Sequence, residues 1–457
     1  MKKSNSPLSR VHLIAVGGAV MHNLALALAA KGLTVTGSDD DIFDPARTRL
    51  AAAGLLPAAV GWDETRITAD LDAVIVGMHA RADNPELLRA RALELPVYSF
   101  PEFVYEQSRD KQRVVIGGSH GKTSITAMIL HVLRFHNQPF DYLVGAQLPQ
   151  FERMVQLSED APVIIIEGDE YLASPLDPRP KFHLYHHHIG VISGIEWDHI
   201  NVFPTAENYL EQFRIFANQT PKAGVLIYDR DDELALEVCV PSHPDVTYIG
   251  YTAHEHVIRD GVTYVLTKKD DEVPLRIFGE HNLRNLSAAR EVCRQLGIKG
   301  RDFYDAIASF GGAARRLELL IEQPGGRIYR DFAHAPSKVR ATTRSTKAQF
   351  GAGHRLLAVL ELHTFSSLNP AFLPQYAGAL DAADEAVVYF NPHVLEHKRL
   401  PALAPETVQA AFQRPDLRVI TTRADLDAWL RARLPLQGAT LLLMSSGTFD
   451  GLNVAEL

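Results

Sequence analysis

The chain has 457 residues, of which 46% are hydrophobic and 22% charged, and its formal net charge is −9. This composition is typical of a water-soluble globular protein of two to four domains. The acidic balance argues against a general nucleic-acid-binding protein, which usually has a basic excess, and no apolar run approaches the roughly 20 residues of a membrane span.

The start of the chain, "MKKSNSPLSR", is polar and lacks the apolar core of a signal peptide. The only two cysteines, Cys239 and Cys293, have no CxxC partner, which indicates buried or free thiols in a reducing compartment. We therefore expect a cytoplasmic protein without nucleic-acid or membrane partners.

Residues 1–109 alternate β-rich apolar runs with helical segments, which predicts βαβ units around a parallel sheet. A helix is expected between the first two strands, ending at Gly32. Before it, the turn "AVGGAVMHN" contains Gly17 and Gly18, and Asp39 ends the second strand. This combination is similar to a dinucleotide-binding turn, although the glycine pattern is incomplete. A tight turn without a ligand is the alternative.

The stretch "IGGSHGKTSIT", residues 116–126, predicts a buried strand, a glycine turn and a helix. Backbone N–H groups and the helix N-terminus would cradle a phosphate, Lys122 would add a positive charge, and Thr123 could bind Mg²⁺ through its hydroxyl. The full P-loop pattern requires a glycine where Ile116 stands, so the loop is a shortened one. The expected nucleotide-binding residues are Gly118, Ser119, His120, Gly121, Lys122, Thr123 and Ser124.

Two later strands end in metal-binding residue types: Glu167 closes "VIIIE" and His199 closes "GIEWDH". Ligands bind at the carboxyl ends of parallel strands, so Thr123, Glu167 and His199 could together hold Mg²⁺, with Mn²⁺ as an alternative because imidazole is a softer ligand. Glu167 and His199 could instead only cap their strands. The run His186–His188 is not a metal candidate, because adjacent side chains on a strand point in alternate directions.

Residues 110–313 form the predicted central domain. Residues 314–457 again alternate strands and helices, which predicts a further α/β domain.

Taken in order, seven motifs of the chain resemble those of the Mur ligases, ATP-dependent enzymes that build the peptide stem of bacterial peptidoglycan. They are "GSHGKTS", "EGDE", "GIEWDH", "GEHNLRNLSAA" (279–289), "ARRLE" (314–318), "RDFAHAPSK" (330–338) and "MSSGTFDG" (444–451). The resemblance covers essentially the whole chain and accounts for the shortened loop. It implies an α/β fold of three domains: a Rossmann-like N-terminal domain for UDP-N-acetylmuramate (1–109), a central P-loop ATPase-type domain for ATP and Mg²⁺ (110–313), and a Rossmann-like C-terminal domain for the amino-acid or peptide substrate (314–457).

The resemblance also implies roles for individual residues. Lys122 would contact the terminal phosphates of ATP, Asn282 and Asn285 the adenine, Arg316 the γ-phosphate and Asp331 the ribose, the last two when the C-terminal domain closes. Lys122, His199 and Arg316 would be the catalytic residues. The expected substrate contacts are Gly17, Gly18, Asp39, His79, Asn84, His120 and His363. The alternatives are that Arg316 is a surface residue, Asp331 a turn cap and Asn282 a helix N-cap.

The acceptor is suggested by departures from the family pattern. Several members of the family have a carbamylated lysine near the position of Phe213. The branch that uses UDP-N-acetylmuramate itself lacks that lysine, and this chain resembles that branch. One member of that branch adds L-alanine and another adds the tripeptide L-Ala-γ-D-Glu-meso-diaminopimelate. The stretches "EYLASPLDPRPKF" and "SSGTFDG" favour the peptide, and Thr364 replaces the arginine that follows His363 in the alanine-adding member. We expect a peptide acceptor, with L-alanine as the alternative, and a monomer or homodimer.

The expected reaction proceeds through an acyl phosphate, which the amine attacks to form an amide with release of ADP and phosphate. No general base is evident; His120, Glu170 and His334 are candidates. Two other classes are weighed against the ligase. A nicotinamide-dependent dehydrogenase is opposed by the incomplete glycine pattern, and a nucleotide-gated binding protein without chemistry is opposed by the predicted metal ligands.

Overall fold

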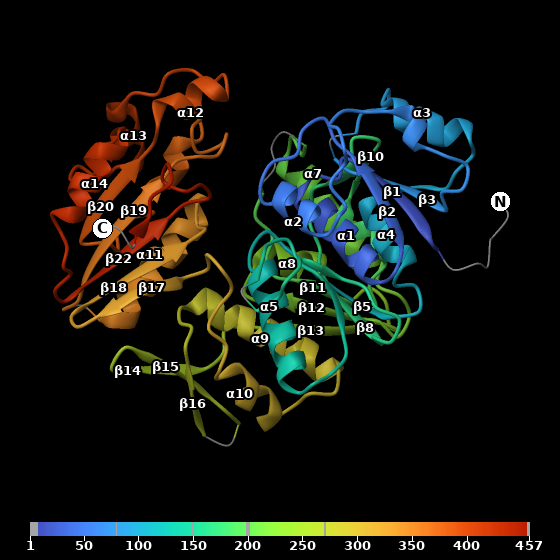
Figure 1. Ribbon diagram of the computed structural model, residues 1–457. Helices are drawn as coiled ribbons and strands as arrows, with labels where there is room; N and C mark the ends of the chain where they lie inside the picture. Colours follow the sequence, from blue (N-terminus) through green and yellow to red (C-terminus); the bar gives the residue numbers. More distant parts are fainter. Residues whose placement is uncertain are drawn as a thin grey trace. The chain divides into compact units, whose positions relative to one another are not determined.

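The computed structural model describes residues 8–78, 80–148, 150–197, 202–268, 271–351 and 353–454. The chain divides into two compact units: the first contains residues 1–252 and 285–306, and the second residues 253–284 and 307–457. Both are mixed α/β structures with largely parallel sheets (Figure 1), so the predicted fold class is confirmed. The domain boundaries near residues 109 and 313 stay predictions.

The N-terminal part of the first unit is a four-stranded parallel sheet in the order β2-β1-β3-β4. All four strands are those expected from the apolar runs. The predicted helix is α1, which ends at Ala30; Lys31 is its C-cap and Gly32, with a φ of +95°, follows. The strands are β1 (Arg10–Ile14), β2 (Thr34–Ser38), β3 (Ala73–Val76) and β4 (Val97–Ser99); the helices are α1 (Ala19–Ala30), α2 (Ala46–Ala52), η1 (Glu64–Arg66), α3 (Pro85–Ala92) and α4 (Phe100–Glu106).

The larger sheet of the first unit has seven strands in the order β13-β12-β11-β5-β8-β6-β7, parallel except for β7. Strand β5 lies in the middle, where the strand order reverses, and this is the position at which open parallel sheets bind ligands. The strands are β5 (Gln112–Gly117), β6 (Asp141–Leu143), β7 (Val155–Gln156), β8 (Val163–Glu167), β11 (Ile189–Ile192), β12 (Val225–Asp229) and β13 (Thr247–Tyr251).

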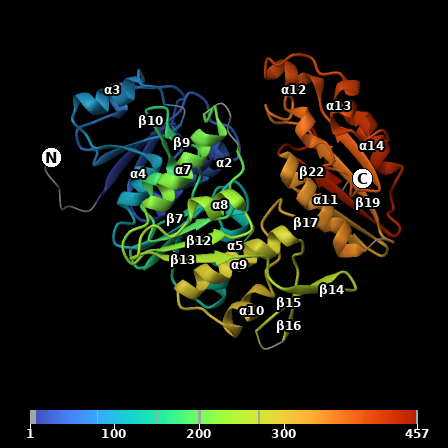
Figure 2. The same ribbon diagram turned by 180° about the vertical axis from the view of Figure 1, so that it is seen from behind.

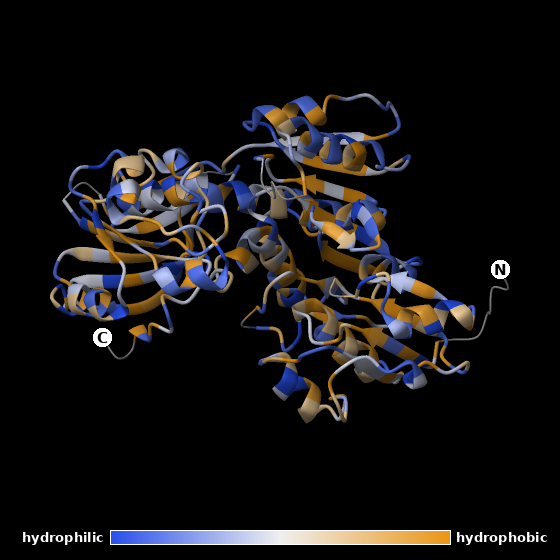
Figure 3. Cartoon of the chain, turned by 90° about the horizontal axis from the view of Figure 1, so that it is seen from above, coloured by the Kyte–Doolittle hydropathy of each residue, from blue (hydrophilic) through white to orange (hydrophobic). Residues whose placement is uncertain are grey.

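Helices and a small hairpin complete the first unit. Helix α5 packs against β5 and β8 (Figure 1). Apolar residues of α1, such as Met21 and Leu24, share one hydrophobic cluster with Leu143 and Val155 of the large sheet, so the two sheets of this unit are joined by a continuous core. Figure 3 shows the hydrophobic residues concentrated on the strands. The further elements are α5 (Lys122–Phe135), β9 (Leu172–Ser174), β10 (Asp177–Pro180), α6 (Lys181–Leu184), α7 (Ala206–Asn218), α8 (Glu233–Val238) and α10 (Arg301–Ile307).

The second unit contains a three-stranded antiparallel sheet and a six-stranded sheet in the order β17-β18-β22-β19-β20-β21, in which only β17 runs antiparallel. Helix α11 packs against β19 and β22 (Figure 2). The strands are β14 (His256–Arg259), β15 (Val262–Leu266), β16 (Glu272–Leu275), β17 (Glu318–Gln323), β18 (Gly326–Asp331), β19 (Arg355–Glu361), β20 (Glu385–Tyr389), β21 (Arg418–Ile420) and β22 (Ala439–Met444). The helices are α11 (Pro336–Phe350), η2 (Leu373–Tyr376), α12 (Pro392–His397), α13 (Pro405–Phe412) and α14 (Arg423–Arg431), while residues of α9 (Glu280–Gln295) belong to both units.

Both cysteines are free and buried, as predicted, and burial raises the pKa of each thiol. Such buried thiols are poor nucleophiles, because the thiolate is the reactive form. Within the described ranges, no helix is both long enough and apolar enough to cross a membrane.

Candidate functional site

The phosphate loop lies between the end of β5 at Gly117 and the start of α5 at Lys122. Gly118 and Gly121 have φ values of +128° and +75°, which L side chains rarely adopt. A Cβ at Gly118 would collide with the Ser193 hydroxyl, and one at Gly121 with the side-chain oxygen of Asn285. Only glycine fits at either position, so the loop forms a tight turn at the N-terminus of a 14-residue helix.

Lys122 is held inside this turn by a carboxylate from a distant part of the sequence. Its Nζ donates to Glu170 Oε2 at 2.7 Å and to the Gly118 carbonyl at 2.5 Å. Burial alone would lower the pKa of the ammonium group, but the charges of Glu170, Asp169 and Glu167 outweigh burial and raise it. Lys122 is therefore positively charged, in a place where it can balance phosphate charge.

The lysine is one member of a polar network that the sequence did not reveal. Tyr209 donates its hydroxyl hydrogen to Glu170 Oε1 at 3.2 Å, and its hydroxyl oxygen lies 2.8 Å from Ser119 Oγ. The backbone N–H of Glu196 donates to Ser119 Oγ at 2.8 Å, and Glu196 Oε2 lies 2.8 Å from His120 Nε2. Loop residues Ser119 and His120 are thus fixed from α7 and from the segment after β11. Tyr209 carries no motif signal that could have identified it beforehand.

Two of the three predicted metal ligands lie side by side. Thr123 donates to Glu167 Oε1 at 2.8 Å, and Glu167 Oε2 accepts from the backbone N–H of Gly145 at 2.8 Å. These oxygen donors suit Mg²⁺, a hard cation. His199 lies outside the described residues; β11 ends at Ile192, earlier than the strand expected to close at His199. Among the described residues, no group of three or more His, Cys, Asp and Glu side chains forms a metal site.

The predicted N-terminal turn opens into a pocket of about 590 Å³. Gly17 donates its N–H to Asp39 Oδ2 at 2.7 Å, so the turn and the acid at the end of β2 come together as expected. Burial, and then the neighbouring Asp40 carboxyl, raise the pKa of Asp39 to about 6. His22 reaches Gly18 through Nδ1, 2.9 Å from its carbonyl oxygen. The pocket is lined by Gly17, Ala19, His22, Asp39, Asp40, Asp41, Phe43, Asp44, Pro45, Ala46, Arg49, Gln147, Glu152 and Met154.

Asn84, another expected substrate contact of the N-terminal part, does not line this pocket. The Asn84 side-chain oxygen caps α3 by accepting from the N–H groups of Glu86 at 3.0 Å and Leu87 at 3.1 Å. Such a cap stabilises a helix start without any ligand. His79 lies outside the described residues, and its expected role stays a prediction.

The two asparagines expected near adenine have different surroundings. Asn285 belongs to the first unit and lies against Gly121 of the phosphate loop. Asn282 belongs to the second unit and donates through Nδ2 to the Phe278 carbonyl at 2.9 Å, so it is not the N-cap of α9.

Arg316 lies in a strained turn of the second unit. Its neighbours Arg315 and Leu317 have φ values of 56° and 46°, which are rare outside glycine. The turn is held by Asp331, whose carboxylate accepts from the N–H groups of Leu317 at 2.6 Å and Ala333 at 2.7 Å. The Arg316 guanidinium packs over the Phe332 ring at 4.6 Å. Asp331 therefore acts as a turn cap in the structure, and ribose binding stays a prediction.

The expected acceptor segment follows β19. His363 Nδ1 lies 3.8 Å from Glu361 Oε1, and the buried Glu361 accepts from the Phe449 N–H at 2.8 Å. The Thr364 hydroxyl donates to Ser367 Oγ at 2.9 Å, which closes a local turn. The threonine is thus bonded within its own segment.

The three adjacent histidines, which were not expected to face one ion, have separate partners. His187 Nε2 lies 2.8 Å from Thr220 Oγ1, His188 Nδ1 accepts from the Arg113 N–H at 3.0 Å, and the His186 ring packs on Tyr105. They do not converge on one point.

Comparison with known proteins identifies the family of this chain. The chain matches the Mur ligase family, catalytic domain, over residues 10–112 and the Mur ligase middle domain over residues 116–293. The UDP-N-acetylmuramate–L-alanine ligase of Arthrobacter sp. (strain FB24) is 33% identical over 395 residues, which cover 84% of this chain and 82% of the relative. The chain belongs to the Mur ligase family. Its resemblance to that family, inferred from the motifs, is confirmed, and it is an ATP-dependent amide ligase of peptidoglycan biosynthesis.

Other relatives of this Mur ligase differ in acceptor. The UDP-N-acetylmuramate–L-alanyl-γ-D-glutamyl-meso-2,6-diaminoheptandioate ligase of Escherichia coli (strain K12) is 27% identical, over 97% of this chain and 96% of the relative. A crystal structure of a UDP-N-acetylmuramate–alanine ligase from Thermotoga maritima aligns with a TM-score of 0.69 at 20% identity, covering 97% of this chain and 96% of that one. The latter supports the three-domain Mur ligase fold.

Proposed function

We propose that this Mur ligase joins the lactyl carboxylate of UDP-N-acetylmuramate to the amine of L-alanine, with conversion of ATP to ADP and phosphate. The observation that carries this proposal is the phosphate loop: a partly buried, charged Lys122 beside the Thr123–Glu167 pair. It lies in the same compact unit as the pocket at Gly17 and Asp39. That unit would bind ATP at the loop and the sugar nucleotide in the pocket.

A free carboxylate does not acylate an amine, because oxide is a poor leaving group. Transfer of the γ-phosphoryl group to the carboxylate replaces oxide with phosphate as the leaving group. Lys122 would stabilise the charge that develops during this transfer, an effect worth most when the cation is already fixed in position. Glu170 and Tyr209 provide that fixation.

Thr123 and Glu167 would hold Mg²⁺, and their hydroxyl and carboxylate oxygens fit that ion. When bound, the ion would neutralise phosphate charge. Arg316 and Asp331 belong to the second unit, and their expected contacts with ATP rest on the family resemblance. Both Glu170 oxygens are engaged by Lys122 and Tyr209, so we assign Glu170 the role of holding these groups rather than that of a general base.

L-alanine is the first acceptor to test, because several relatives at 30% identity or more are UDP-N-acetylmuramate–L-alanine ligases. A peptide, which the sequence motifs favoured, is the second candidate. The Escherichia coli peptide-adding relative aligns over 97% of this chain. In addition, Thr364 forms a local turn with Ser367 in place of the arginine that gives a small carboxylate a two-point contact.

The test is phosphate release with UDP-N-acetylmuramate, ATP and Mg²⁺ against L-alanine, glycine, L-serine, the tripeptide and the tetrapeptide, with omission of the sugar nucleotide as the control. The ratio of kcat/KM values measures discrimination between acceptors. We expect the highest value for L-alanine. A higher value for the tripeptide would replace the acceptor and keep the ligase, while no release with any acceptor would overturn the ligase proposal.

A further inference from the structure

One connection of the first unit touches both the pocket and the proposed metal ligands. We name it the β6–β7 segment; its described residues are 144–148 and 150–154. At one end, Gly145 donates its N–H to Glu167 Oε2 at 2.8 Å. At the other, the Glu152 carbonyl accepts from Arg49 Nη2 at 2.6 Å, and Met154 N–H donates to Asn23 Oδ1 at 2.9 Å. The segment therefore links α1 and α2, beside the pocket, to the carboxylate bonded to Thr123.

The segment is internally bonded, so a shift at one end is transmitted. Its two ends pair through the Val144 N–H and the Met154 carbonyl at 2.9 Å, and Phe151 N–H donates to the Leu148 carbonyl at 3.1 Å. The Gln147 side-chain amide donates to the Phe151 carbonyl as well. Leu148 and Met154 are buried. Such packed and bonded elements respond as units rather than by continuous deformation.

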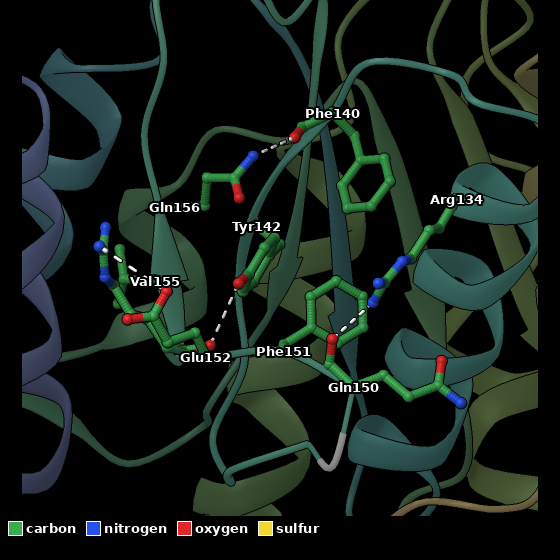
Figure 4. Close-up of a pocket in the computed structure, with 9 residues that line it drawn as sticks. Arg134, Phe140, Tyr142, Gln150, Phe151, Glu152, Val155 and Gln156 are labelled. Carbon is green, nitrogen blue, oxygen red and sulfur yellow. Dashed lines mark hydrogen bonds and ion pairs between the residues drawn. The ribbon is translucent and has the colours of Figure 1, made fainter.

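Residues of the β6–β7 segment also line a second pocket, of about 380 Å³ (Figure 4). The Phe151 ring packs edge-to-face on Tyr142 with centroids 4.9 Å apart, and Arg134 Nη1 donates to the Gln150 carbonyl at 2.5 Å. Figure 4 shows Arg134 pointing to the Gln150 carbonyl and the Tyr142 ring lying beside Phe151. Movement of the segment is restricted on the side of this pocket, which leaves the Arg49 side as the one where a ligand can act on it.

Arg49 is placed to sense a ligand. It lines the 590 Å³ pocket, and its guanidinium contacts the Glu152 carbonyl, the Gln147 side-chain oxygen at 3.4 Å and His22 Nε2 at 3.4 Å. Within the described part of the chain, no carboxylate lies within the 4.0 Å of an ion pair with it. A guanidinium bonded only to neutral groups can still take an anionic partner, and its planar fork suits phosphate or carboxylate.

We propose that Arg49 is a positioning residue that couples the two binding sites of the first unit. It would bind the anionic part of the sugar nucleotide and, through the β6–β7 segment and Gly145, fix Glu167 for the metal–nucleotide complex. Occupancy of the pocket then tightens nucleotide binding, and by linkage nucleotide tightens the sugar nucleotide by the same factor. This inference rests on the proposed function, because it takes UDP-N-acetylmuramate as the occupant of the pocket.

The test is calorimetric binding of a non-hydrolysable ATP analogue with Mg²⁺, with and without saturating UDP-N-acetylmuramate. In the wild-type protein we expect the sugar nucleotide to tighten the analogue about tenfold, within the usual range of coupling. In Arg49→Met, we expect UDP-N-acetylmuramate to bind about tenfold more weakly, its effect on the analogue to disappear, and analogue affinity without sugar nucleotide to be unchanged. A tenfold loss of affinity corresponds to about 1.4 kcal/mol of binding free energy.

Two further variants separate the steps. Arg47→Met, on the same helix but exposed, is the matched control and keeps the coupling, because residues two apart on a helix do not share a face. Asn23→Ala removes the acceptor of the Met154 N–H, so it lowers the coupling factor. Because Asn23 Nδ2 also lies 3.0 Å from His22 Nε2 in the pocket wall, this variant is assessed by the coupling factor and not by sugar-nucleotide affinity.

The outcomes distinguish the inference from the proposed function. If wild-type protein binds both ligands independently, or if Arg49→Met retains the full coupling, the positioning role is overturned and the ligase proposal stands. If wild-type protein binds no UDP-N-acetylmuramate and releases no phosphate with any acceptor, both are overturned.

Discussion

The phosphate loop of the first unit and the Arg316 turn of the second unit each present one cation from a short connection, but they are held in different ways. In the loop, positive φ angles fall on Gly118 and Gly121, and Lys122 is bonded to Glu170, 48 residues away. In the turn, positive φ angles fall on Arg315 and Leu317. That turn is held by two carboxylates: Asp331 accepts from Leu317 and Ala333, and Glu318 Oε2 accepts from the Arg315 N–H at 3.0 Å.

The difference shows two ways of fixing a functional cation. The loop is fixed by a network drawn from several elements, in which each hydrogen bond supports the next. The turn stores backbone strain, of order 1–3 kcal/mol for each residue in a sparsely populated region, and Asp331 compensates for it with two charge-assisted hydrogen bonds. We therefore expect loop variants to lose turnover and turn variants to lose stability.

The largest expected effect is that of Lys122→Ala. Loss of one fixed electrostatic contact with the transferred group costs on the order of 10²–10³ in rate. Phosphate release in the complete reaction measures it, with circular dichroism to verify the fold. Lys222→Ala removes a lysine that is 89% exposed and serves as the control. Turnover within twofold of wild type in folded Lys122→Ala would show that the network does not serve phosphate transfer.

The first unit also contains a turn that is held by a carboxylate: Asp39 accepts a hydrogen bond from the Gly17 N–H. Because the pKa of Asp39 is raised from 3.8 to about 6, the folded protein binds more protons than the unfolded chain between these pH values. The free energy of unfolding contributed by Asp39 therefore falls as pH rises from about 4 to about 6, by up to about 3 kcal/mol. Urea unfolding across this range, compared between wild type and Asp39→Asn, measures the difference.

The exposed Asp160 supplies the control for this pH series, since Asp160→Asn removes a carboxylate from the same unit. A wild-type-minus-variant difference that is constant from pH 4 to pH 7 would mean that Asp39 does not titrate as its burial indicates.

Asp331→Asn tests the turn itself. An asparagine keeps one oxygen but places an amide N–H₂ against a backbone N–H of Leu317 or Ala333, so one buried donor loses its acceptor. We expect a loss of about 1–3 kcal/mol in the free energy of unfolding, measured by urea denaturation. The exposed Asp416, which pairs with Arg414, gives the matched variant Asp416→Asn, expected to cost under about 1 kcal/mol. Equal effects of the two substitutions would contradict the capping role.

Glu167→Gln has the smallest expected effect on turnover at saturating metal. Replacing a carboxylate ligand by a neutral amide weakens Mg²⁺ binding, and we expect the half-saturating Mg²⁺ concentration to rise about tenfold. Phosphate release titrated with Mg²⁺ measures this. Glu159→Gln, on the surface of the same unit, should leave the titration unchanged. An unaltered half-saturating Mg²⁺ concentration in Glu167→Gln would mean that Glu167 accepts hydrogen bonds from Thr123 and Gly145 but does not bind the metal.

The sequence predicted those parts of the fold and site that depend on neighbouring residues. The four N-terminal strands and α1 follow from apolar runs and from Gly32, and the turn before α5 follows from the glycines of the loop. Thr123 and Glu167 were also expected to meet, because parallel neighbouring strands end at the same edge of a sheet. The end of the strand before His199 was misplaced, since β11 stops at Ile192 and residues 193–197 belong to no strand.

What the sequence by itself determined is the family, the α/β fold and the positions of the glycines and the lysine of the phosphate loop, because these are local patterns of backbone conformation and hydrophobicity. Only the tertiary structure decided that Glu170 meets Lys122 and Tyr209, that Asn285 lies against Gly121, and that Arg49 reaches the β6–β7 segment. These contacts join residues 39 to 164 positions apart, and no short-range pattern encodes them. Their geometry follows from the order of the strands within the sheets and from the packing between the elements.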